Sequence, residues 1–146
     1  MCLRFLCSTA LAGAVLLAAG CGGASVAPVS GRVTLDGKPL ANAAVHFQPK
    51  ATENNLNPGP GSDAMTDDNG NFTLKVVTTG QEGAIVGKHR VEISKYARTR
   101  EIDPTSDQRE APARNLVPAK YNDKTELEFV VPPGGTKEAN FNLKSN

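Results

Sequence analysis

The segment Asp67-Asp68-Asn69-Gly70 places three oxygen-bearing side chains directly before a glycine. Closely spaced carboxylate and amide oxygens can surround a hard cation such as Ca²⁺. An EF-hand loop would also need a downstream acidic ligand and flanking helices, and residues 72–75 supply neither. Asp, Asn and Gly favour tight turns on their own account. We therefore predict a hairpin turn at this position, with a calcium site as the alternative.

A second segment, Gly83-Ala84-Ile85-Val86-Gly87-Lys88-His89, has some features of a phosphate-binding loop. That motif needs four residues between its glycines, and Ser or Thr after the lysine. Here three residues separate the glycines and His89 follows Lys88. We predict instead that the two glycines let the chain bend into a strand.

His46 and His89 are the two histidines of the chain, and neither has the spacing of a metal ligand or a catalytic triad. Their place in the alternating pattern predicts that His46 points outward and that His89 shares the side of Val91. The segment Gly23-Ala24-Ser25-Val26-Ala27 lacks the last glycine of a nucleophile elbow. We predict that the protein is not an enzyme and has no catalytic residue, cofactor or metal ligand. The weakest alternative is a hydrolase that uses a histidine with Arg and Asp.

All three cysteines lie within the first 21 residues. Residues 1–4 carry one positive charge, residues 5–17 are almost entirely apolar, and Ala18-Ala19-Gly20 places three small residues before Cys21. This pattern is typical of an export signal, and the apolar run is shorter than the roughly twenty residues that span a bilayer. We predict that residues 1–20 form a signal helix that is removed. Cys21 would then be the one remaining cysteine, so no intramolecular disulfide could form.

The stretch Leu17-Ala18-Ala19-Gly20-Cys21 resembles the lipobox of bacterial lipoproteins, with the leucine one place further upstream than in the strongest form of the pattern. The resemblance implies that Cys21 begins the mature chain and carries acyl chains on its thiol and amino groups. It also implies a protein that is exported and anchored to a bacterial envelope membrane, on the periplasmic or the cell-surface side. The alternative is an ordinary secretory signal that leaves Cys21 unmodified.

The rest of the chain predicts one β-sheet domain after a short linker. Residues 21–28 are small and unpatterned, which favours a flexible tether. In the domain from 29 to 146, apolar residues recur at every second position between turn residues such as Asp36-Gly37 and Pro132-Pro133-Gly134-Gly135. We expect an all-β, antiparallel, immunoglobulin-like sandwich of about seven strands. The residues expected to face its core are Val33, Leu35, Val45, Phe47, Phe72, Leu74, Val76, Val91, Ile93, Leu127, Phe129, Val131, Phe141 and Leu143.

Several segments resemble carboxypeptidase-regulatory-like domains, which have a transthyretin-like sandwich fold. The resemblance covers most of residues 29–143, and His89 stands where these domains usually have Tyr. It implies a fold and a location, and it carries over no active site. The segments are Gly31-Arg32-Val33-Thr34-Leu35-Asp36-Gly37-Lys38-Pro39 within residues 29–47, Thr66-Asp67-Asp68-Asn69-Gly70-Asn71-Phe72-Thr73-Leu74, Gly87-Lys88-His89-Arg90-Val91-Glu92-Ile93, and Pro118-Ala119-Lys120-Tyr121.

The charge and the aromatic residues of the chain argue against two further classes of function. After removal of residues 1–20 the chain would carry 15 basic and 15 acidic residues, which argues against a nucleic-acid partner. Tyr96 and Tyr121 are expected to cover a sandwich edge rather than stack on a sugar, and residues 97–118 to form a solvated loop. We therefore expect a non-catalytic, lipid-anchored envelope module that is structural or binds an envelope protein. The alternative is a glycan- or calcium-binding module built on residues 54–61 or 97–118.

Overall fold

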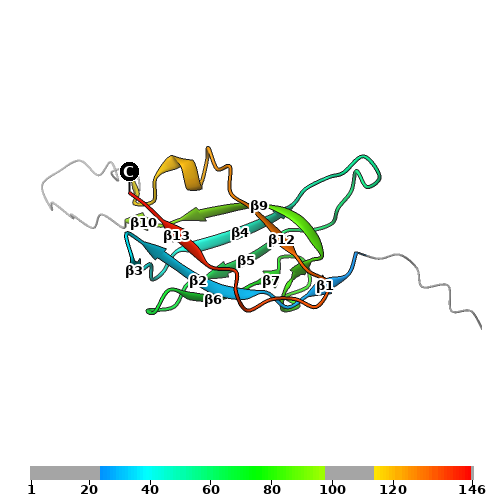
Figure 1. Cartoon of the computed structure of the whole chain (residues 1–146), viewed down its shortest axis with the longest axis horizontal. Helices are drawn as coiled ribbons and strands as arrows, with labels where there is room; N and C mark the ends of the chain where they lie inside the picture. The colour runs from blue at the N-terminus through cyan, green and yellow to red at the C-terminus, as the bar shows by residue number, and fades with distance from the viewer. Residues whose placement is uncertain (1–23, 98–113, 146) are drawn as a thin grey trace, which may run out of the picture.

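The computed structural model describes residues 24–97 and 114–145. These residues form an all-β sandwich, as the alternating pattern predicts, with thirteen strands and one short 3-10 helix. Several of the strands are only two residues long, and the longer ones run along the long axis of the molecule (Figure 1). The signal helix predicted over residues 1–20 lies outside the described residues.

One layer is a five-stranded antiparallel sheet. Its centre is the β4–β9 pair, in which Val45 lies opposite Ile93 and Phe47 opposite Val91. The register therefore puts four of the predicted core residues on one face. In spatial order the strands are β12 (Glu128–Val131), β9 (Gly87–Ser94), β4 (Ala44–Pro49), β5 (Ser62–Met65) and β7 (Lys75–Val76).

The other layer is built around β2 (Ser30–Leu35). On one side β2 pairs with β13 (Phe141–Leu143), and on the other with β3 (Lys38–Pro39) and β6 (Asn71–Thr73). The β2–β3 hairpin turns at Asp36 and Gly37, whose φ angles of 50° and 80° are those of the tight turn that the sequence predicts.

The pairing of β13 with β2 is parallel, which departs from the expected all-antiparallel arrangement. Both strands start at the same end of the sandwich, where Val29 and Thr136 form a parallel bridge. β12 also ends there, with Val131 opposite Gly87. The turn at residues 132–135, closed by the Gly135 N–H donating to the Pro132 carbonyl at 2.9 Å, then reverses the direction of the chain. Because β12 and β13 belong to different sheets, β13 enters beside β2 in the same direction.

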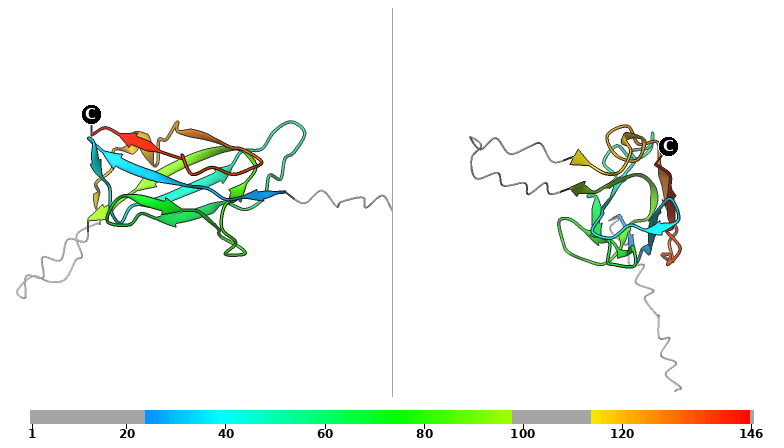
Figure 2. Two further views of the ribbon diagram at one scale, coloured as in Figure 1. Left: turned by 60° about the horizontal axis from the view of Figure 1, so that its bottom comes forward. Right: turned by 90° about the vertical axis from the view of Figure 1, so that its left-hand side faces the viewer.

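Two short ribbons and a 3-10 helix complete the fold. The ribbon of β1 (Val26–Ala27) with β8 (Ala84–Ile85) lies at one end of the sandwich, and that of β10 (Tyr96–Ala97) with β11 (Arg114–Asn115) at the other (Figure 2). The helix η1 covers Ala119–Tyr121. Most of the loop predicted over 97–118 lies outside the described residues, and β10 and β11 join its two ends.

The core lies between the two sheets and contains the residues that the alternating pattern predicts. Eleven of the fourteen predicted residues are buried, and the other three, Leu35, Leu127 and Phe129, are partly buried against them. Aromatic rings join the two layers. The Phe47 ring on β4 lies 6.0 Å from the Phe141 ring on β13, and 5.6 Å from that of Phe129.

Candidate functional site

Cys21, the site residue predicted from the sequence, lies outside the described residues, and the candidate site is the end of the sandwich at which the described chain begins. Ser25 accepts a hydrogen bond from the Val86 N–H at 2.8 Å, and Val26 and Ala27 pair with β8. Ala27 and Val29 are each 1% exposed. The flexible tether predicted over 21–28 is therefore wrong for residues 26–28, because this part of the chain belongs to the folded domain.

The close approach of β1 depends on Gly83, the residue before β8. Its φ of 116° lies in a region that residues with side chains rarely adopt. A Cβ atom at this position would lie 2.1 Å from the Ala27 carbonyl oxygen. The sequence correctly predicts that Gly83 and Gly87 bend the chain into a strand, and β9 rather than a helix follows them.

Residues 50–61 form a loop that lies against this end. Pro and Gly are frequent in residues 54–61, and such a composition is typical of a loop. The loop is held by reciprocal backbone hydrogen bonds of 3.0 Å between Thr52 and Asn55. A cavity of about 170 Å³ separates the loop from the start of β1, with Ala24, Pro58 and Ile85 among its lining residues. Figure 1 shows this loop projecting at the end of the molecule where β1 begins.

Three large apolar side chains are exposed around this end: Leu56 at 83%, Val130 at 63% and Val77 at 58%. Leu56 belongs to the loop, and the Val77 N–H donates to Gly61 at 3.0 Å where the loop ends. Val130 on β12 lies opposite Lys88 on β9. We call Leu56, Val77, Val130 and the loop of residues 50–61 the tethered end. No pattern in the sequence predicts this surface, although Leu56 is a single large apolar residue among Asn, Pro and Gly.

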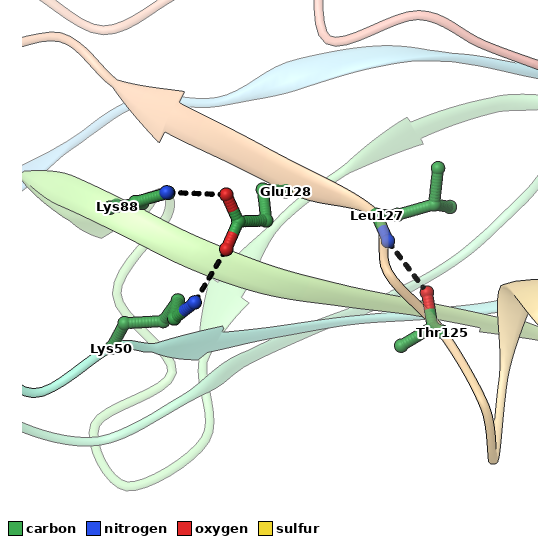
Figure 3. A network of polar contacts seen from close by, with 5 residues as sticks. All are labelled: Lys50, Lys88, Thr125, Leu127 and Glu128. Atoms are coloured by element: carbon green, nitrogen blue, oxygen red, sulfur yellow. Dashed lines mark hydrogen bonds and ion pairs between the residues drawn. The ribbon is translucent and has the colours of Figure 1, made fainter.

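Two lysines and one glutamate form an ion-pair cluster beside the tethered end (Figure 3). Lys50 and Lys88 each contact one carboxylate oxygen of Glu128. The hydrogen bond from Lys50, and then that from Lys88, lowers the pKa of Glu128. The Lys50 N–H also donates to the Lys88 carbonyl at 2.8 Å, so the cluster fixes the base of the loop to β9.

The aspartate-rich segment at residues 67–70 is a tight turn, but it is not the predicted hairpin, because it joins β5 of one sheet to β6 of the other. One carboxylate oxygen of Asp67 accepts the N–H groups of Asn69 and Asn71 at 2.9 and 2.8 Å, and the other accepts the Asn71 amide at 3.2 Å. These bonds, led by the Asn71 backbone N–H, lower the pKa of Asp67. Across residues 24–97 and 114–145, no group of three or more His, Cys, Asp or Glu side chains could hold a metal ion.

A shallow groove of about 540 Å³ lies over β2 and β6 and is a second candidate. Its lining is mostly polar, with Arg32, Asp67 and Lys137 as the charged side chains. Arg32 is already engaged, because its Nε donates to the Asn69 carbonyl at 2.9 Å.

The two histidines lie on opposite faces of the five-stranded sheet, as predicted. His46 is partly exposed, and its Nδ1 contacts a carboxylate oxygen of Asp63 on β5. His89 is 1% exposed and packs against Phe47, with ring centroids 5.7 Å apart. Its Nδ1 donates to the Gly87 carbonyl at 3.0 Å. Its Nε2 is buried and has no hydrogen-bond partner among the described residues.

The tyrosines differ in position. Tyr121 is confirmed as an edge residue: its ring packs against the core and its hydroxyl accepts the Lys144 N–H at 3.1 Å. Tyr96, in contrast, is 57% exposed on β10.

Comparison with known families gives one match. A family model described as Domain of unknown function (DUF6795) matches residues 29–109, more than half of the chain. The chain belongs to this family. The match spans β2 to β10, whereas β1 and the strands from β11 to β13 lie outside it. No curated protein and no solved structure matches the chain.

A search of the described residues for membrane spans found no helix that is long and apolar enough to cross a bilayer.

Buried His89 predicts a pH-dependent stability. Burial lowers the pKa of His89 from 6.5, and the Gly87 hydrogen bond opposes this only partly. Below about pH 6.5 the unfolded chain therefore binds a proton that the folded chain does not, and the free energy of unfolding falls by up to about 1.4 kcal/mol per pH unit. We expect a shallower slope for His89→Phe between about pH 7 and 5. Chemical denaturation at several pH values measures both slopes. His46 is present in both proteins, so equal slopes would contradict the prediction.

Proposed function

We propose that the protein is a non-catalytic, lipid-anchored β-sandwich of the bacterial cell envelope, acting as a structural or protein-interaction module. The observation that carries the proposal is the sequence Leu17-Ala18-Ala19-Gly20-Cys21, which ends in the last cysteine of the chain. Acylation of Cys21 on its thiol and amino groups would supply several chains, and each buried CH₂ contributes about 0.8 kcal/mol to membrane binding. The membrane would then be the first partner of the domain.

The use of polar residues in the fold supports a non-catalytic role. The Thr66 hydroxyl donates to the Leu40 carbonyl at 2.6 Å and accepts the Ala43 N–H at 2.8 Å. The Thr125 hydroxyl donates to the Val91 carbonyl at 2.8 Å and accepts the Leu127 N–H at 3.1 Å (Figure 3). Together with Asp67, these side chains serve turns and strand ends.

We further propose that the sandwich is of the carboxypeptidase-regulatory-like, transthyretin-like type. Its support is the β2–β3 hairpin at Asp36-Gly37 and the turn at residues 67–70, both of which occur in segments that resemble those domains.

Metabolic labelling with an alkyne fatty acid tests the anchor. We expect the wild-type protein to incorporate the label and the Cys21→Ser variant to incorporate none, because the serine hydroxyl does not replace the thiol as acyl acceptor. Mass spectrometry of the mature protein should find an N-terminal peptide that begins with acylated Cys21. An unmodified Cys21 in protein recovered from the soluble fraction would remove the anchor from the proposal.

The alternative function, binding of a glycan or calcium, has one supporting observation, the polar groove over β2 and β6. A glycan array and calcium titration calorimetry would test it. Glycan binding that is lost on Arg32→Ala would favour this function over the structural one.

A further inference from the structure

The tethered end must lie close to the membrane if Cys21 is acylated. Three peptide steps separate Cys21 from Ala24, the first described residue. Even when fully extended, they span about 11 Å. The chain is folded from β1 onward, where Val26 pairs with Ile85. The anchor therefore constrains which part of the sandwich can reach the lipid.

The opposite end lies beyond the reach of this linker. β9 runs from Gly87, beside the tethered end, to Ser94 near the β10–β11 ribbon. Its eight residues extend about 23 Å at 3.3 Å per residue. If the long axis of the sandwich is perpendicular to the membrane, Tyr96 and β11 lie well away from the membrane surface.

The exposed apolar residues alone do not distinguish the two ends. Met65, Tyr96 and Leu116 are 61%, 57% and 46% exposed, and they lie at or towards the opposite end. Exposed apolar residues that occur singly are normal on a soluble protein. The linker length distinguishes the two ends, because it keeps the exposed apolar residues of the tethered end, and not those of the opposite end, close to the proposed anchor.

One part of the loop of residues 50–61 lies close to the start of the folded chain. Its Gly59 lies beside Ala24 and Ile85, so that a Cβ atom there would be 3.7 Å from the Ala24 Cβ and 3.3 Å from the Ile85 Cδ1. Leu56, three residues earlier, is the most exposed of the large apolar residues that the structure describes. Lys50 and Lys88 at the base of the loop carry two positive charges, and the carboxylates of Glu128 and Glu53 balance them. Contact with lipid is therefore inferred from the exposed apolar side chain of Leu56 and from the linker length, and not from net charge.

We propose that the tethered end is a membrane-contacting surface, in which Leu56 enters the lipid interface and Val77 and Val130 face it. This inference rests on the proposed acylation of Cys21. The occupant of the surface is the phospholipid bilayer that holds the anchor. Contact at a second point, besides the acyl chains, would hold the long axis of the sandwich upright and present the β10–β11 end to the envelope space.

Single-cysteine labelling of the mature, lipidated protein tests the proposal. Acylation blocks the Cys21 thiol, so a cysteine introduced as Leu56→Cys is the one site for a thiol-reactive, polarity-sensitive fluorophore such as NBD. The matched control is Met65→Cys, since Met65 is also exposed but lies at the far end of β5. Both proteins are reconstituted into vesicles of phosphatidylethanolamine and phosphatidylglycerol.

We expect the label at position 56 to shift its emission to the blue and to be quenched by brominated phospholipid, and the label at position 65 to do neither. An unshifted label at position 56 on vesicle-bound protein would overturn the membrane-contacting surface and leave the anchor intact. Equal shifts at both positions would mean that the sandwich lies on its side, which also overturns the inference. Labelling of wild-type protein at Cys21 would show a free thiol, and the proposed anchor would then fail together with this inference.

Discussion

Replacing Phe47 by alanine is expected to lower the free energy of unfolding by about 3–5 kcal/mol, the range for removal of a buried aromatic ring. Phe47 is fully buried on β4. Its ring lies 5.6–6.0 Å from those of Phe129, His89 and Phe141, so it contacts residues of both sheets. The cavity left by the ring would lie between two sheets that cannot close on it without breaking strand register.

Denaturation of the purified mature protein by guanidinium, followed by far-ultraviolet circular dichroism, measures this loss, since the chain has no Trp. The matched control is Phe129→Ala. Phe129 lies on strand β12, at the sheet edge, and is already partly exposed, so a smaller loss is expected. Equal losses for the two variants would contradict the central position of Phe47.

The strands that the sequence predicts are those that bury one face. In β4 the alternation of Val45 and Phe47 with His46 and Gln48 matches the observed burial, and the same holds in β2, β6, β9, β12 and β13. The reason is that a strand with one buried face must alternate with a period of two. Turn residues such as Asp36-Gly37 mark where such strands end, because few residues adopt positive φ.

β5 was missed because its sequence carries no such pattern. Ser62-Asp63-Ala64-Met65 contains no β-branched or aromatic residue, and its buried positions include Ser62. The strand is specified by its neighbours, since β4 and β7 pair with its two sides. β1 also lacks an alternating pattern and was not predicted.

Val26 and Ala27 of β1 follow a run of small residues, and their partner β8 lies more than fifty residues later in the chain.

For the candidate site, the sequence predicts the acylation proposed for Cys21 but not the surface formed by Leu56, Val77 and Val130. The sequence offers Cys21 as the candidate, because the proposed acylation would need a specific residue after a specific pattern. The tethered end joins Leu56, Val77 and Val130 from three separate parts of the chain, and each by itself is an ordinary exposed residue. Their common position depends on the pairing of β1 with β8 and on the direction of β9 and β12. Such long-range pairings are not encoded in any single segment.

The junction between β1 and Gly83 links the fold to the proposed function. If β1 separated from β8, residues 24–28 would be added to the linker and the sandwich could move away from the membrane. The hydrogen bonds from the Val86 N–H to Ser25 and from the Thr136 N–H to Pro28, both 2.8 Å, keep the linker short. The proposed membrane contact by Leu56 would therefore depend on a strand of two residues.

Replacing Gly83 by alanine is accordingly expected to lower the free energy of unfolding by about 2–6 kcal/mol, because backbone strain and overpacking each cost about 1–3 kcal/mol. The strain follows from the φ of 116°, and the overpacking from the approach of the new Cβ to within 2.1 Å of the Ala27 carbonyl oxygen. That oxygen belongs to β1, so we expect β1 to be displaced. Hydrogen exchange at the Thr136 amide, which donates to Pro28, should become faster, and guanidinium denaturation gives the overall loss.

Gly87→Ala is the matched control for this prediction. Gly87 has a φ of 127°, close to that of Gly83, but a Cβ atom there would have no neighbour within 4 Å. It should show the backbone strain alone, a loss of about 1–3 kcal/mol, and leave exchange at Thr136 unchanged. The difference between the two variants then measures how closely β1 is packed. Equal losses, with Thr136 equally protected in both, would mean that the fold accommodates the new Cβ atom without displacing β1, and would contradict the prediction.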